Sequence, residues 1–156
     1  MRIGLVADTH DAICDWPAVL SRIVAALGDV DLVLHCGDIT TTAALDDLES
    51  IAPVRASRSA GDPPPDPPRL DDGPRVIEVG GFAVGLAFVR PEGPPAEVFG
   101  CRVDAVVCGG THTASVEEVD GLLYVNPGSP SLSKTPTVAV LVLGEGMAPT
   151  AEVVPV

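Results

Sequence analysis

The first third of the chain alternates between short apolar runs and helical patterns, and this alternation constrains the fold more than any other feature. Residues 2–7 and 31–36 read as buried strands, and Val54 belongs to a third strand. Between the first two runs, apolar residues recur at helical spacing from a cap at Asp15 to a terminating glycine, Gly28. A second, acidic helix is predicted over 41–50. This order is typical of parallel βαβ units.

The rest of the chain is rich in strand patterns. The pair Asp120-Gly121 lies between two short apolar runs and gives the strongest hairpin signal, and Gly80-Gly81 gives another. Together with the first third, this pattern predicts an α/β protein in which two packed mixed β-sheets are flanked by helices. Strands are expected at 76–79, 82–88, 104–108, 115–119, 122–125, 138–143 and 151–154.

One segment interrupts these patterns. Five of the eight residues in Gly61-Asp62-Pro63-Pro64-Pro65-Asp66-Pro67-Pro68 are prolines, which remove backbone donors and fix φ. We interpret 61–72 as a stiff, extended surface loop, too short and too central to separate two domains. A single domain is therefore expected over 1–156, a length that can bury a substantial core.

The charge of the chain restricts its partners. The chain has nine Lys and Arg residues and 22 Asp and Glu residues, which gives a formal net charge of −13. Such a surface argues against non-specific binding to nucleic acids or to anionic membranes, although a bound cation could still attract a phosphoester. The N-terminus has no secretory pattern and the four cysteines have no Cys-x-x-Cys spacing, so a cytoplasmic location with reduced thiols is expected.

Polar side chains with metal-binding chemistry follow three of the expected strands. Asp8 and His10 stand two residues apart after the first strand, Asp38 follows the second, and His112 follows the strand at 104–108. Ligand sites in open α/β sheets lie beyond the carboxyl ends of the strands. Each residue alone is a weak signal, but two carboxylates and two imidazoles together suit Mn, Zn, Fe, Co or Ni.

The order of these motifs resembles that of the calcineurin-like metallophosphoesterases, especially the small bacterial and archaeal phosphodiesterases. Asp8-Thr9-His10 and Gly37-Asp38 match the first two family motifs, and Asn126-Pro127-Gly128-Ser129 is similar to a turn of the small members. The resemblance extends from Met1 to about Ser133. It implies a four-layer αββα sandwich and one divalent metal site made of Asp8, His10, Asp38 and His112.

The chain departs from the family pattern where a second metal would bind. Ser57 stands in place of the metal-binding Asn of Gly-Asn-x-Asp, and Ser59 in place of its acid. Phe88 replaces a ligand His at the end of a strand, and Gly110 replaces the first His of Gly-His-x-His. The resemblance therefore implies that only the shared carboxylate, Asp38, remains at the second site.

Two functions are compatible with this pattern. The first is a metal-dependent phosphodiesterase-like enzyme that acts on a small phosphoester with one metal ion, slowly because a two-metal clamp is missing. Arg58 or Arg90 is a minority candidate for a phosphate contact that replaces the lost charge. The alternative is a non-catalytic module that binds metal or a protein partner, similar to the retromer subunit with this fold.

Several nearby residues have two interpretations. His35 is expected to pack or to orient a ligand rather than bind metal, and Asp11 to stabilise a turn rather than touch bound water. Asp62 could reach the metals if its loop shifts. Cys36 and Cys108 could bind zinc if they face the site, but buried inert thiols are more common.

Overall fold

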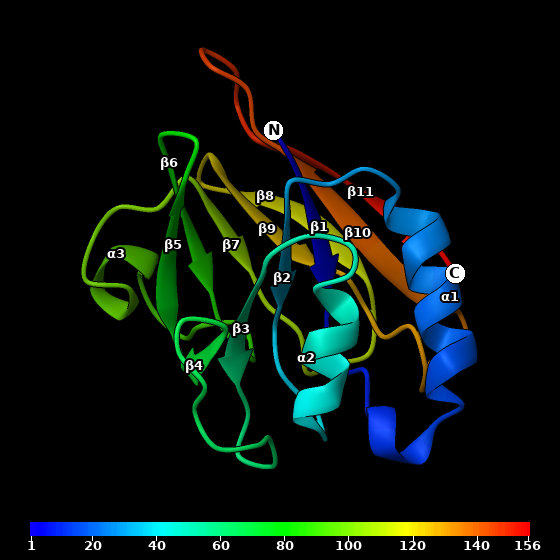
Figure 1. The fold of residues 1–156 in the computed structure, drawn as a ribbon. Helices are drawn as coiled ribbons and strands as arrows, with labels where there is room; N and C mark the ends of the chain where they lie inside the picture. The colour runs from blue at the N-terminus through cyan, green and yellow to red at the C-terminus, as the bar shows by residue number, and fades with distance from the viewer.

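The computed structural model describes all 156 residues, and its first sheet is built around the expected parallel strands. Strands β1, β2, β3 and β4 run parallel, while β10 and β11 extend the sheet in antiparallel fashion on the other side of β1 (Figure 1). The sheet order is β11 (Thr150–Pro155), β10 (Thr137–Val142), β1 (Arg2–Val6), β2 (Leu32–His35), β3 (Val54–Arg58) and β4 (Leu70–Asp72).

Two helices cover the outer face of this sheet (Figure 1). Helix α1 spans Trp16–Leu27, and the Asp15 carboxylate accepts a hydrogen bond from the Ala18 N–H as its N-cap. Helix α2 spans Thr42–Leu48, with the Thr41 hydroxyl accepting from the Ala44 N–H. The predicted helices are confirmed with these bounds, and a short 3₁₀ helix, η1 (Asp11–Ile13), precedes α1.

The second sheet has five strands and mixes both directions. Its hairpins turn at the expected glycines: Val119 pairs with Leu122 across Asp120-Gly121, and both turn residues have positive φ. The sheet order is β5 (Arg75–Val79), β6 (Phe82–Leu86), β7 (Ala105–Val107), β9 (Leu122–Asn126) and β8 (Ser115–Val119).

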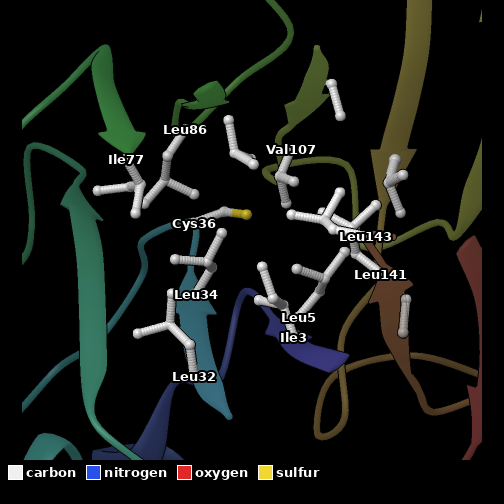
Figure 2. Packing of buried hydrophobic residues seen from close by; sticks show 14 of the residues in the cluster. Ile3, Leu5, Leu32, Leu34, Cys36, Ile77, Leu86, Val107, Leu141 and Leu143 are labelled. Atoms are coloured by element: carbon white, nitrogen blue, oxygen red, sulfur yellow. The ribbon is translucent and has the colours of Figure 1, made fainter. Parts of the chain in front are cut away.

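The hydrophobic core has two parts. One cluster lies between the sheets, and in it Leu34 and Cys36 point toward Leu86 and Val107 (Figure 2). The other lies between the six-stranded sheet and helices α1 and α2. Aliphatic side chains fill both clusters, as the 3% aromatic content requires.

The predicted sandwich is confirmed, with differences at two places. The outer face of the five-stranded sheet carries only a four-residue helix, α3 (Pro95–Val98), and Phe99 after it packs over Gly85. The loop expected over 61–72 ends earlier, because Leu70 is buried and β4 pairs with β3. None of the helices combines the length and hydropathy needed to cross a membrane.

Candidate metal centre

Three strand ends bring the four predicted ligands together. Asp8 and His10 follow β1, Asp38 follows β2 and His112 follows β7. One ligand atom from each side chain lies within 4.8 Å of the other three, and no other group of three or more His, Cys, Asp or Glu side chains is placed in this way. Nε2 of His10 lies 3.3 Å from Nε2 of His112 and 3.5 Å from Oδ2 of Asp38. The four side chains therefore lie close together, and their role as metal ligands stays a prediction.

The backbone at all four residues is in the left-handed region. Their φ angles are 52° at Asp8, 46° at His10, 59° at Asp38 and 57° at His112, and Asp120 in a hairpin turn is the only other non-glycine residue with positive φ. Such conformations cost about 1–3 kcal/mol each and are concentrated at functional sites. The surrounding loops must therefore hold this cluster in place.

The hydrogen bonds of His112 direct one ring nitrogen toward the cluster. Its Nδ1 lies 3.2 Å from the carbonyl oxygen of Leu132, which can only accept, so Nδ1 carries the proton in the neutral ring. Nε2 is then unprotonated and faces His10 and Asp8. This is the tautomer that a metal-binding histidine adopts, with its second nitrogen bonded to a carbonyl.

The Asp8 side chain is fully buried, and both of its oxygens accept hydrogen bonds from the Gly110 N–H, at 3.0 and 3.2 Å. Burial raises the pKa of Asp8 despite this hydrogen bond and the two nearby histidines. A cation in the cluster would offset that burial. The donor set, its convergence and the tautomer of His112 thus fit a divalent metal ion of the kind predicted.

A network around Ser59 holds the other carboxylate. The Ser59 hydroxyl donates to Oδ1 of Asp38 at 2.6 Å, and its oxygen lies 2.9 Å from Oδ1 of Asp62. Asp62 also accepts from the N–H groups of Ser59 and Ile39, each at 2.9 Å. The contacts of the Asp62 carboxylate are thus with Ser59 and with backbone N–H groups. The other oxygen of Asp38, Oδ2, faces His10.

The turn at 126–129 ties the ligand loops together. The Ser129 hydroxyl donates to the Asp8 carbonyl at 2.8 Å, and Nδ2 of Asn126 donates to the Gly109 carbonyl at 3.3 Å. The Ser131 hydroxyl donates to the Thr9 carbonyl at 2.7 Å. These contacts join the loop after β1 to the loop after β7. The turn at 126–129 therefore positions the candidate ligands by binding the backbone carbonyls of their loops.

His35 is buried behind the ligands. Its Nδ1 accepts from the Gly37 N–H at 3.1 Å, so Nε2 carries the proton that points to the Thr9 hydroxyl at 3.2 Å. Burial lowers the pKa of His35 to about 3, which keeps the ring neutral. His35 therefore positions the loops of Asp8 and Asp38, in agreement with the orienting role predicted from sequence.

The remaining candidates lie beside the cluster. Asp11 accepts from the Thr40 N–H and the Thr41 hydroxyl, so its carboxylate joins η1 to the segment before α2 instead of stabilising its own turn. Cys36 and Cys108 are buried outside the cluster, and burial raises the pKa of Cys108 to about 11. Both thiols are therefore protonated and inert at neutral pH.

Arg58 and Arg90, the predicted phosphate contacts, are both paired with carboxylates. The Arg58 guanidinium pairs with Asp72, and Arg90 pairs with Glu117 at 2.9 Å while lying over the Tyr124 ring. Each guanidinium would have to leave its partner to reach a phosphate, so this contact stays a prediction.

The comparisons with known proteins agree with the fold and with the family resemblance of the sequence. A model of the calcineurin-like phosphoesterase superfamily domain matches residues 1–146. A probable metallophosphoesterase of Methanothermobacter thermautotrophicus is 32% identical over 153 residues, which cover 92% of this chain and 85% of that protein. Another, from Methanocaldococcus jannaschii, is 28% identical over 92% of this chain and 75% of its own length.

Solved structures show the same fold at lower sequence identity. An archaeal phosphodiesterase superposes with a TM-score of 0.75 at 22% identity, covering 98% of this chain and 99% of its own. Vps29 of Entamoeba histolytica, solved as a zinc complex, superposes with a TM-score of 0.72 at 21% identity, covering 99% of both chains. From the match over 1–146 and the curated relatives, the chain belongs to the calcineurin-like phosphoesterase superfamily.

Proposed function

We propose that the protein is a phosphodiesterase-like hydrolase that works with one divalent metal ion, held by Asp8, His10, Asp38 and His112. The observation that carries this proposal is the convergence of these four side chains from three strand ends, with ligand atoms within 4.8 Å of one another. A cation bound there would polarise a phosphoryl group and lower the pKa of a water molecule.

The surroundings of Asp38 support a single ion. The positions of the missing ligands hold a buried Ser57 hydroxyl, the Phe88 ring and Gly110, which has no side chain. Oδ1 of Asp38, which a second ion would need, accepts the Ser59 hydroxyl. A second cation would therefore have one carboxylate oxygen as its ligand and would first have to displace a hydrogen bond.

The chain's own residues hold the catalytic geometry. His112 keeps an unprotonated nitrogen toward the cluster through its bond to Leu132, and Gly110 fixes the Asp8 carboxylate. In the proposed hydrolysis, a water oxygen bonds to phosphorus and gives up a proton, the P–O ester bond breaks, and the leaving alkoxide takes up a proton to become the alcohol. Without a second ion to stabilise the leaving oxygen, we expect turnover to be slow.

The test is hydrolysis of bis-p-nitrophenyl phosphate with and without added Mn²⁺. We expect activity that depends on the metal and is lost in Asp38→Asn, because this variant removes a negatively charged ligand. Activity that is independent of metal, or unchanged in Asp38→Asn, would contradict the proposal.

A second candidate function is a metal-binding module without catalysis. It is favoured by the loss of the second-metal ligands at Ser57, Phe88 and Gly110. The Vps29 structures among the structural neighbours, at 20–22% identity, show the fold alone. The two candidates differ in one assay: the module binds metal without turning over any of a panel of phosphomonoesters and phosphodiesters. A cytoplasmic location is proposed for either function.

A further inference from the structure

A cavity of about 360 Å³ is lined by two of the residues that stand in place of the family's second-metal ligands, Ser57 and Phe88. It is lined by Ser57, Arg58, Gly73, Phe88 and Arg90 among others. We call it the Phe88 cavity, because the half-buried ring of Phe88 forms the wall nearest the candidate ligands.

The Phe88 ring lies against two of the three turns that carry these ligands. A side-chain carbon added to Gly37, the residue before Asp38, would lie 2.8 Å from Cδ2 of Phe88. One added to Gly110, whose N–H binds Asp8, would lie 3.5 Å from Cζ of the same ring. A group attached to a phosphate at the cluster could therefore extend directly over Phe88.

The Phe88 cavity also contains a polar group that lacks a partner. The Ser57 side chain is fully buried, and its hydroxyl is the one buried side-chain polar group without a hydrogen bond. A side-chain carbon on Gly73 would lie 1.9 Å from this hydroxyl, so the Gly73 backbone packs directly against it and helps to close it off. Ser57 therefore offers no accessible surface to an occupant, whose contacts must come from the half-buried and exposed residues of the lining, Phe88 among them.

The charges around the Phe88 cavity favour an uncharged occupant. Arg58 is paired with Asp72 and also donates to the Pro63 carbonyl at 2.7 Å. Arg90 is paired with Glu117, and Glu92 adds a further carboxylate to the lining. Neither guanidinium is free to bind a second phosphate, whereas the Phe88 ring suits an uncharged planar group that stacks on it.

We infer that the Phe88 cavity is a subsite for an uncharged planar group, aromatic or heterocyclic, on the alcohol portion of the phosphoester. The planar group stacks on Phe88 while the phosphate lies at the metal cluster. This inference rests on the proposed phosphoesterase function, since it needs the phosphate to be bound at Asp8, His10, Asp38 and His112.

The test compares the binding of phenylphosphonate and methylphosphonate to the Mn²⁺-loaded protein by calorimetry, which needs no turnover. We expect the phenyl compound to bind about tenfold more tightly to the wild type, because its ring is buried against Phe88. Phe88→Ala should remove this preference and leave metal binding unchanged. Phe82→Ala, at the start of strand β6 and six residues before Phe88, is the matched control and should keep it.

The outcomes separate the two proposals. If the metal-loaded wild type binds neither phosphonate, the phosphoesterase function itself is contradicted. If it binds both equally, or if the preference persists in Phe88→Ala, only the subsite is overturned. Phe88→Leu, which keeps an apolar side chain but loses the ring, provides the same comparison should the alanine variant not fold, with circular dichroism as the check on folding.

Discussion

Replacing Ser59 by alanine tests how Asp38 is held. The hydroxyl donates to Oδ1 of Asp38 at 2.6 Å, and Ser59→Ala removes this donor. Asp62 keeps its two backbone donors, and the Asp38 side chain is 25% exposed, so water can replace the lost bond. We therefore expect a loss of only about 1 kcal/mol in unfolding free energy, or about 2–4 °C in Tm.

Metal affinity should change more than stability does. Without the Ser59 hydroxyl the Asp38 carboxylate can rotate, and loss of such an orienting contact weakens metal binding roughly 10- to 100-fold. Calorimetric titration of the apo protein with Mn²⁺ measures the change. Ser21→Ala, on the exposed face of α1, serves as the control. A Kd for Ser59→Ala within about twofold of the wild type would refute the positioning role, and binding of a second ion would show that Ser59 alone excludes it.

Three further predictions concern residues around and below the site. The pKa of His35 is lowered to about 3, so folding stability falls as pH drops below the unfolded value of 6.5. We expect the wild type to have a higher unfolding free energy than His35→Gln at pH 7, and this difference should shrink by roughly 3 kcal/mol at pH 4.5, as measured by urea unfolding in EDTA. A difference that stays constant with pH would contradict the lowered pKa of His35. Arg90→Ala should leave phosphate affinity of the metal-loaded protein unchanged, since Arg90 is paired with Glu117, and a clear loss of affinity would restore the predicted phosphate contact. Leu34→Ala, between the two sheets, should cost about 2–5 kcal/mol, whereas the exposed Leu132→Ala should cost under about 0.5, and equal effects would contradict the described core.

The sequence was sufficient to predict the parts of the fold that local patterns determine. The apolar runs of β1 and β2 and the helix from Asp15 to Gly28 carry their own periodicity and caps. Strand β4 has only three residues, and it exists because Leu70 is buried against the core and because β4 pairs with β3. Helix α3 is a single turn with no buried residue. Neither has a pattern that could be recognised without its neighbours.

The candidate site likewise has features that the sequence was sufficient to predict and features that depend on the folded structure. Asp8, His10, Asp38 and His112 each stand next to a strand end, so strand topology was enough to bring them together. The pairing of Ser59 with Asp62 depends on how the chain folds back after β3, and the pairing of Arg90 with Glu117 depends on the register of β8 beside β9. The sequence placed Asp62 and Ser59 near the site, but it offered no signal that they bind each other.

The measurement that tests the account most directly is the metal content of the protein purified without chelator, with Asp8→Ala and His112→Ala beside it. The account predicts about one ion per chain in the wild type and none in either variant, because all four ligands are needed. Two ions per chain would contradict the single site and point to ligands beyond these four. No ion, even after adding Mn²⁺ or Zn²⁺, would contradict the metal centre itself.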